Sequence, residues 1–189
     1  AKQKMSEFYR DKLRIYRDEY PNTAEEIKTS MIDSVRKYGS KLCIIDNLMT
    51  VDLGADSNNM NEKQTEFVNW LIQFAMKYNV AVVLVCHPRK LQTGVTNVGM
   101  YDISGSSNII NLAHRAFGLR RVTPKEKEGI PKQDGSGWKV KPIQYDVIFE
   151  VIKDRMRGKA NLEVGLYYDV PSRRFYTNPE EYDFKFGWD

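Results

Sequence analysis

The amino-acid sequence contains few cysteines and no long apolar run. The two cysteines, Cys43 and Cys86, both lie in short apolar segments and match no metal-ligand spacing, so they are expected to be small core side chains. This pattern is typical of a protein in a reducing compartment. No stretch approaches the roughly 20 apolar residues of a membrane span, and the polar N-terminus lacks the apolar centre of a signal peptide. We therefore expect a protein that does not act in a membrane.

The sequence also has little excess of one charge sign over the other. The 29 basic and 25 acidic side chains give a formal net charge of only +4 over 189 residues. Because this surplus is small, it does not by itself indicate nucleic-acid binding, and the placement of the charges matters more than their sum. An apolar content of 41% is sufficient for a core, and the length predicts one domain.

Two short apolar segments each end abruptly in a polar residue. Residues 42–45 lead into Asp46, and residues 80–86 lead into His87, which a proline and two basic residues follow. Such segments predict buried parallel strands, and ligands of open α/β sheets bind where parallel strands end. The structural alternative is that both polar residues are ordinary strand caps. The recurrence of the pattern favours a ligand site.

Helices are predicted between these strands. Residues 13–16 indicate a short first strand, after which Asn22 or Thr23 is expected to cap an amphipathic helix that ends at Gly39. A second helix carries an apolar and aromatic stripe from residue 67 to residue 78, which favours packing against a sheet. The order strand, helix, strand is the unit of a parallel sheet with right-handed crossovers.

The C-terminal half instead predicts paired antiparallel strands. These strands are expected at residues 116–121, 145–153, 162–168 and 174–176. Residues 123–142 are rich in lysine, glycine and proline, which predicts a solvated hairpin loop or insertion whose charges form ordinary wet surface. Residues 179–189 form a tail without a clear assignment.

Four elements in this order resemble the second half of the ATPase core of DnaB-type hexameric replicative helicases, especially the phage-encoded and Twinkle-like members. Asp46 matches the Walker B aspartate of that family, and His87 matches its sensor position. Residues 101–108 (Tyr-Asp-Ile-Ser-Gly-Ser-Ser-Asn) resemble its DNA-facing Asp-Leu-Arg-Gly-Ser-Gly segment. Residues 152–158 are similar to its Lys-x-Arg-x-x-Gly motif. The resemblance covers residues 13–176, and four elements in order are far more specific than any one of them.

The resemblance implies a RecA-like P-loop NTPase core of the α/β class, a mostly parallel sheet flanked by helices with antiparallel strands at its C-terminal end. Residues 1–178 would form this domain, with 123–142 as an insertion and 179–189 as a tail. One departure is large: the sequence contains no Gly-x-x-x-x-Gly-Lys-Ser/Thr phosphate loop, no strand before it and no match to the catalytic glutamate. We therefore expect the C-terminal portion of a helicase core, or a degenerate ATPase domain that became a binding module.

The missing strand has a structural consequence. In the family it lies between the His87 strand and the strand at residues 116–121. Without it, both strands would carry unpaired backbone groups along one edge, which favours marginal stability or self-association.

The resemblance also implies roles for the polar residues. Asp46 would hold Mg²⁺ through water, and His87 would sense the γ-phosphate of ATP. Lys153 and Arg155 alternate on a strand and would project from one face, where two adjacent cations need an anion between them. Arg155 would then be an arginine finger for the ATP of the neighbouring subunit, with Lys153 as its companion; the alternative is a surface ion pair. Three weaker candidates for nucleotide contacts are Asn111, Arg121 and Arg157.

Contact with single-stranded DNA is implied for small residues whose backbone amides can approach phosphates closely. The candidates are Arg89, Lys90, Ser104, Gly105, Ser106 and Ser107. Ser104 replaces an arginine that is frequent in the family, which weakens the electrostatic attraction of this segment for DNA.

The expected function is therefore part of an ATP-dependent replicative DNA helicase, a hexamer that hydrolyses ATP with Mg²⁺ at subunit interfaces and moves along single-stranded DNA. It would act in bacterial or phage-infected cytoplasm, with a helicase loader or primase as a further partner. The chain alone is expected to be inactive. Two alternatives stay open: a RecA-type recombinase or repair ATPase, which shares the Asp46 strand, and a non-catalytic module that binds DNA or subunits, which the missing phosphate loop favours.

Overall fold

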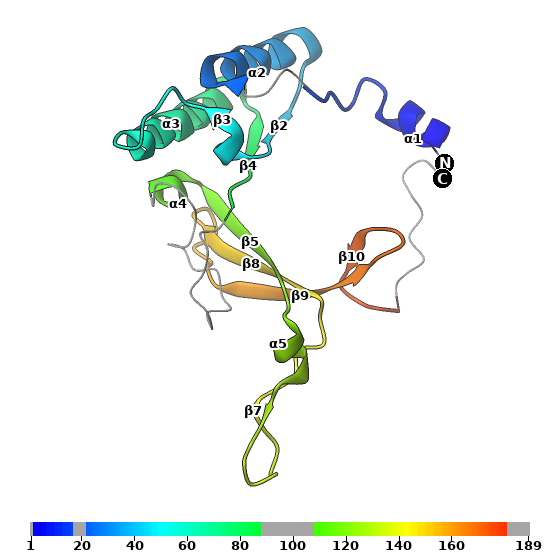
Figure 1. The fold of residues 1–189 in the computed structure, drawn as a ribbon. Helices are drawn as coiled ribbons and strands as arrows, with labels where there is room; N and C mark the ends of the chain where they lie inside the picture. The colour runs from blue at the N-terminus through cyan, green and yellow to red at the C-terminus, as the bar shows by residue number, and fades with distance from the viewer. Residues whose placement is uncertain (1, 17–21, 88–107, 181–189) are drawn as a thin grey trace. The chain divides into compact units, whose positions relative to one another are not determined.

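The computed structural model describes residues 2–16, 22–87 and 108–180 (Figure 1). Its contacts divide the chain into two compact units. Residues 14–113 form one of them, called here the parallel unit. Residues 1–13 and 114–189 form the other, called here the antiparallel unit.

The parallel unit is built from short strands and two long helices. Its elements are β1 (Asn22–Thr23), α2 (Ala24–Tyr38), β2 (Leu42–Ile45), the 3-10 helix η1 (Leu48–Thr50), β3 (Val51–Asp52), α3 (Met60–Tyr78), β4 (Ala81–Leu84) and α4 (Asn108–Leu112). Strands β2 and β4 pair in parallel, and α3 connects them along the chain. Strands β1 and β3 form a second, shorter parallel pair.

Local signals in the sequence set both ends of α2. The Thr23 hydroxyl accepts a hydrogen bond from the Glu26 N–H at 3.2 Å, and the Glu26 carboxylate accepts one from the Thr23 N–H at 2.8 Å. This capping box satisfies N–H groups that the first helical turn leaves without partners. At the other end, Gly39 has a left-handed backbone with φ of 68° and donates to the Val35 carbonyl. The predicted helix is confirmed, with Thr23 rather than Asn22 as its cap.

One hydrophobic core holds the parallel unit together. Its buried members come from α2, β2, η1, β3, α3 and α4, and they are Met31, Ile45, Leu48, Val51, Phe67, Val68, Leu71, Phe74 and Ile109. Cys43, Val82 and Leu84 of the strand pair pack against this cluster, so one face of the pair is covered. Both cysteines are free thiols, and burial raises their pKa values, as expected for small core side chains.

The other face of the strand pair is open. Leu42 is 52% exposed, Ile44 is 62% exposed and Val83 is 46% exposed, because successive side chains of a strand point to opposite faces. Strands of a parallel sheet are usually apolar on both faces because helices cover both. The prediction that these two strands are buried is therefore correct for one face only.

The antiparallel unit is dominated by a four-stranded sheet (Figure 1). Its elements are α1 (Lys2–Tyr9), β5 (Arg115–Arg121), α5 (Pro124–Glu128), β6 (Ile130–Pro131), β7 (Trp138–Val140), β8 (Val147–Asp154), β9 (Leu162–Asp169) and β10 (Arg174–Tyr176). The sheet has the order β10-β9-β8-β5, and every neighbouring pair is antiparallel. The strands predicted for the C-terminal half are confirmed, and residues 123–142 form α5 and a separate hairpin of β6 and β7.

Two predictions about strands have different outcomes. Residues 13–16 have no regular structure, and Leu13 and Ile15 are 55% and 66% exposed, so the predicted first strand is wrong. An apolar alternation forms a strand only where a neighbouring strand completes the hydrogen-bond ladder. The expected unpaired edges are present: among the described strands, β4 pairs with β2 alone and β5 pairs with β8 alone.

Candidate functional site

The structure brings Asp46 and His87 to the same edge of the β2–β4 pair. Ile45 lies opposite Leu84, the Val85 N–H donates to the Ile45 carbonyl at 2.9 Å, and the Leu48 N–H donates to the Val85 carbonyl at 3.0 Å. Asp46 follows β2 directly, and His87 comes shortly after β4. Both side chains are exposed. The two polar residues that the sequence pattern singled out therefore belong to one edge.

Asn47 connects the two strand ends. Its Nδ2 lies 3.0 Å from His87 Nε2, and its Oδ1 accepts a hydrogen bond from the Met49 N–H at 2.9 Å, which caps η1. Sequence analysis did not single out this residue. The available signal is a short amide directly after a strand-end carboxylate, since such an amide can cap a turn and bind a second group at the same time.

A magnesium ion that keeps its water shell fits this edge better than a fully ligated metal does. Mg²⁺ in nucleotide sites is bound by one or two carboxylates together with waters and phosphates, and Asp46 offers one exposed carboxylate. Within residues 2–16, 22–87 and 108–180, no three His, Cys, Asp or Glu side chains gather as a metal site. The donor set thus suits water-mediated Mg²⁺.

The second pair of predicted site residues lies in the antiparallel unit. Strand β8 ends at Asp154, so Arg155 is a turn residue and does not alternate with Lys153 along a strand as predicted. The Arg155 N–H donates to the His114 carbonyl at 3.1 Å. Burial lowers the pKa of Lys153, and the positive charge of Arg155 lowers it further. The turn after β8, and not strand alternation, therefore sets the position of Arg155 relative to Lys153.

Asp154 holds this turn in shape. Its Oδ1 accepts hydrogen bonds from the N–H groups of Met156 at 3.0 Å and Arg157 at 3.3 Å, and Arg115 Nε lies 3.5 Å from it. Burial opposes ionisation of this carboxyl group, but the hydrogen bonds from Arg157 and Met156 and the charge of Arg115 outweigh it and lower the pKa of Asp154. Asp154, which lies between Lys153 and Arg155 in the sequence, thus holds the backbone of the turn that contains Arg155.

The other candidates are placed as follows. Asn111 is exposed on α4, Arg121 is exposed at the end of β5, and Arg157 is exposed in the turn after β8. The six residues predicted to contact DNA lie outside the described residues: Arg89, Lys90, Ser104, Gly105, Ser106 and Ser107. The structure thus places Asp46 and His87 at one edge of the β2–β4 pair, and Lys153 and Arg155 at the end of β8 and in the turn after it.

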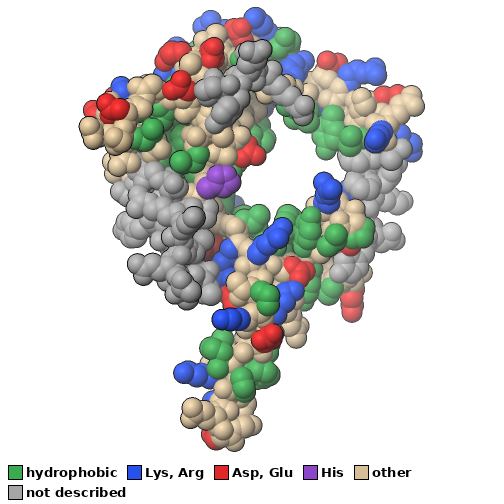
Figure 2. Space-filling view, viewed as in Figure 1, with side chains coloured by type: hydrophobic (Ala, Val, Ile, Leu, Met, Phe, Trp, Pro, Cys, Tyr) green, Lys and Arg blue, Asp and Glu red, His purple; other side chains and the backbone are tan. Residues whose placement is uncertain are grey.

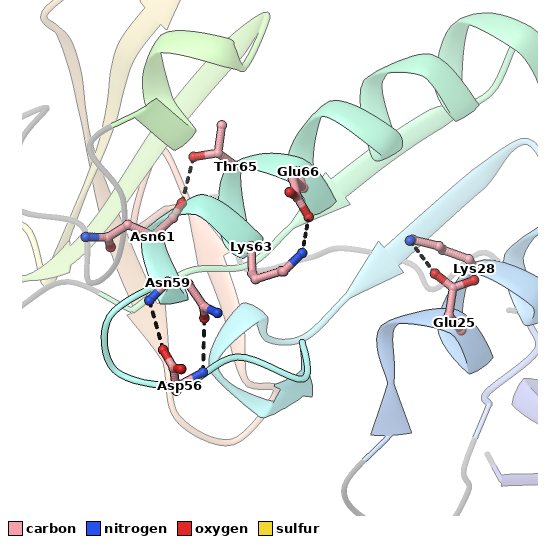
Figure 3. A network of polar contacts seen from close by, with 8 residues as sticks. All are labelled: Glu25, Lys28, Asp56, Asn59, Asn61, Lys63, Thr65 and Glu66. Carbon is pink, nitrogen blue, oxygen red and sulfur yellow. Dashed lines mark hydrogen bonds and ion pairs between the residues drawn. The ribbon is translucent and has the colours of Figure 1, made fainter.

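A cavity of about 320 Å³ in the parallel unit involves none of the predicted site residues. Its walls come from the start of α2, the segment after β3 and the first turns of α3. Figure 3 shows that its lysines are bound to glutamates of their own helices, Lys28 to Glu25 at 2.6 Å and Lys63 to Glu66 at 2.8 Å. Because these charges are compensated locally, the cavity indicates no ligand.

Comparisons with known proteins agree with this architecture. A family profile described as an AAA domain matches residues 5–93, which include Asp46 and His87. No curated protein matches the sequence. A solved structure described as "The Structure Of A DnaB-Like Replicative Helicase And Its Interactions With Primase" is similar to 82% of this chain, with a TM-score of 0.61 and 17% sequence identity. The chain spans 35% of the length of that helicase chain.

The similarity at this level of identity concerns the fold. The chain has a RecA-like α/β fold, with parallel strands flanked by helices and antiparallel strands towards its C-terminus. Its fold is therefore similar to the part of the DnaB-like helicase structure that it matches. In the part of the chain that the structure describes, no helix has the length and apolar character needed to cross a lipid bilayer.

Proposed function

We propose that this chain is part of an ATP-dependent DNA helicase that couples ATP hydrolysis at subunit interfaces to movement along single-stranded DNA. The observation that supports this best is the placement of Asp46 and His87 at one edge of a parallel strand pair, in a fold similar to that of a DnaB-like helicase. That edge is where open α/β sheets bind nucleotides.

Asp46 and His87 would have different roles at this edge. Hydrolysis of ATP requires a metal-bound phosphate, an oriented water and positive charge near the developing anion. Mg²⁺ would neutralise phosphate charge, and Asp46 would hold the waters of its shell. His87 would donate a hydrogen bond to the γ-phosphate and respond to its loss.

Lys153 and Arg155 would supply the positive charge. Burial and the charge of Arg155 lower the pKa of Lys153, and an anion bound near both side chains would favour their charged forms. We assign this anion to the γ-phosphate of ATP held by the neighbouring subunit of a hexamer, with Asn111, Arg121 and Arg157 as further nucleotide contacts. Arg89, Lys90 and Ser104 to Ser107 would contact DNA. A primase or helicase loader is a further candidate partner, since the similar helicase structure is described with primase.

A non-catalytic module that binds DNA or subunits is the second candidate function. The absence of a Gly-x-x-x-x-Gly-Lys-Ser/Thr sequence among the 189 residues favours it, because the amides and lysine of that loop hold the phosphates. For the same reason, the purified chain should hydrolyse ATP no faster than buffer. Mg²⁺-dependent turnover by these residues alone would show that phosphate binding does not need the loop.

The deciding experiment replaces Asp46 by Asn in the full-length polypeptide that contains this sequence. DNA-stimulated ATP hydrolysis should be abolished while the circular dichroism spectrum is retained, because only the charge that binds the metal changes. Asp33→Asn on the surface of α2 is the matched control and should keep full turnover. Unchanged hydrolysis in Asp46→Asn would refute the metal role, and a wild-type protein without hydrolysis would favour the non-catalytic module.

A further inference from the structure

Asn47 makes two hydrogen bonds that together fix the orientation of its amide. A backbone N–H can only donate, so the atom that receives the Met49 N–H at 2.9 Å is the side-chain oxygen, Oδ1. The atom that lies 3.0 Å from His87 Nε2 is then the amide nitrogen, Nδ2. The usual ambiguity between the two ends of an asparagine side chain is removed here by the backbone partner.

The amide nitrogen in turn determines the protonation of the histidine ring. The Nδ2 amide group can donate hydrogen bonds but cannot accept them. His87 Nε2 must therefore accept this hydrogen bond, so it carries no proton. A neutral imidazole has one proton, which is then on Nδ1. We infer that Asn47 is a positioning residue that holds His87 in the neutral Nδ1–H tautomer. Nδ1 is left as the only hydrogen-bond donor of the ring.

This tautomer completes the proposed site. A ring whose Nε2 is occupied by Asn47 has only Nδ1–H for a phosphate oxygen, so the geometry selects which ring nitrogen senses the nucleotide. The identity of that anion rests on the proposed function. The tautomer itself rests only on the contacts among Asn47, Met49 and His87.

The tautomer is measurable by ¹⁵N NMR on the histidine-labelled chain at about pH 8, above the usual histidine pKa of ~6.5. His87 Nδ1 should show the shift of a protonated nitrogen and Nε2 that of a bare one. His114 is the only other histidine and is exposed, so it provides an internal reference. A His87 ring with its proton on Nε2, or with the same tautomer ratio as His114, would overturn the inference.

Two variants separate positioning from folding. In Asn47→Asp the carboxylate only accepts, so the His87 proton should move to Nε2, whereas Asn47→Ala should leave a mixture of tautomers. His114 should be unchanged in both. In the full-length polypeptide, Asn47→Asp should lower DNA-stimulated hydrolysis more than nucleotide binding. If the tautomer switches and hydrolysis does not change, the inference stands and the sensor role in the proposed function is wrong.

A second, independent observation concerns the hairpin of β6 and β7 together with Lys141, which follows it directly, residues 130–141. Figure 1 shows it projecting from the four-stranded sheet of its unit. Its base is anchored: Arg120 pairs with Glu126 at 2.9 Å, Lys127 pairs with Asp146, and the Ile143 N–H donates to the Glu126 carbonyl at 2.9 Å. These contacts attach the base of the hairpin to α5 and to the neighbouring strands of its unit.

The surface of this hairpin combines apolar and basic groups, as the space-filling view shows (Figure 2). Ile130, Trp138 and Val140 are 51%, 46% and 46% exposed. Beside them the segment contains Lys132, Lys139 and Lys141 against a single acid, Asp134. The Asp134 carboxylate is engaged by the N–H and hydroxyl of Ser136 in the turn, which lowers its pKa.

We propose that this hairpin binds single-stranded nucleic acid. Trp138 would stack on a base, and the three lysines would lie near phosphates, since sequence-tolerant single-strand binding combines an aromatic platform with positive charge. The proposal goes beyond the proposed function, because the hairpin shares no residue with the strand-end site or with the DNA contacts expected between residues 89 and 107.

The test uses the purified 189-residue chain and a fluorescein-labelled oligothymidine at low salt. Trp138→Ala should weaken binding about tenfold, Trp138→Phe should restore most of it, and Lys139→Glu should weaken binding and its salt dependence. Lys37→Glu in α2 is the matched control and should bind as the wild type does. Equal binding by all variants, equal loss in Lys37→Glu, or no binding by the wild-type chain would overturn the proposal; a preference for an acidic peptide over the oligonucleotide would identify a protein partner instead.

Discussion

The two units place their polar groups by different physical means. In the parallel unit, β2 and β4 end at the same edge, so residues 40 positions apart in the sequence, Asn47 and His87, share a hydrogen bond. In the antiparallel unit, the turn after β8 brings near neighbours in sequence together, and Asp154 fixes that turn. Parallel pairing thus assembles a site from distant segments, whereas an antiparallel turn presents a local motif.

The units also differ in what stabilises them. The parallel unit depends on a core between its helices and one face of the β2–β4 pair, whose strands have four residues each. In the antiparallel sheet, the two central strands β8 and β9 have eight residues each, and the buried apolar side chains are fewer, while Phe117 and Leu119 are 55% and 60% exposed. We expect substitutions in the core to dominate in the first unit and substitutions that disturb strand pairing to dominate in the second.

The largest expected effect concerns Arg155, in the turn after β8. If Arg155 acts on ATP of the neighbouring subunit, Arg155→Ala in the full-length polypeptide should lower DNA-stimulated hydrolysis by about 10³-fold or more, while nucleotide binding changes far less. Arg36→Ala on α2 is the control and should leave hydrolysis unchanged. A surface ion pair would behave differently, since its loss changes stability by about 1 kcal/mol or less and leaves turnover intact.

Mixed assemblies sharpen this prediction. Arg155→Ala subunits mixed with Asp46→Asn subunits should regain some hydrolysis, because one type of interface then pairs an intact Asp46 with an intact Arg155. No recovery despite confirmed co-assembly would count against the interface assignment.

The next effect contrasts two phenylalanines. Phe74 is 3% exposed in the core of the parallel unit, and Phe117 is 55% exposed on the antiparallel sheet. Phe74→Ala should lower the free energy of unfolding by about 3–5 kcal/mol, because it leaves a cavity. Phe117→Ala should cost about 1 kcal/mol, mainly through its stacking on Phe149. Urea denaturation of both variants measures this difference, and equal costs would break the comparison between the units.

The next prediction concerns Gly165 of β9, where a larger side chain would disturb packing on the antiparallel sheet. A Cβ at Gly165 of β9 would overlap the ring of Tyr145, which also packs against Tyr167 with ring centroids 5.2 Å apart. Gly165→Ala should therefore destabilise the unit by about 1–3 kcal/mol. The double variant with Tyr145→Ala should recover part of that loss in thermal unfolding, and a Gly165→Ala chain as stable as the wild type would contradict the contact.

The smallest expected effect depends on pH. The hydrogen bonds from Lys127 and from the Tyr168 N–H lower the pKa of Asp146. A carboxyl group with a lowered pKa in the folded state contributes stability above its unfolded pKa of ~3.9 and loses it as the pH falls through the folded value. Because Asp146 is 36% exposed, the contribution should be about 1 kcal/mol or less. Asp146→Asn should reduce the difference in melting temperature between pH 6 and pH 3, and an undiminished difference would exclude this role.

The predictions from sequence succeeded where the signal was local. Helix α2 begins after Thr23 and ends before Gly39, as expected, because capping needs only residues within one helical turn. The strand predicted at residues 13–16 failed because alternation does not supply a pairing partner. Arg155 was expected on a strand, yet β8 ends one residue earlier, where Asp154 turns the backbone.

The sequence by itself determined α2 with its caps, the segments that form β2, β4, β5, β8, β9 and β10, and the absence of a phosphate loop, since all of these are properties of contiguous residues. Only the tertiary structure decided that Asn47 meets His87, that burial lowers the pKa of Lys153, and that one face of the β2–β4 pair is open. Each of these depends on strand register or on the elements that cover a surface. The free energy of such contacts comes from groups far apart along the chain, so no local pattern of residues records them.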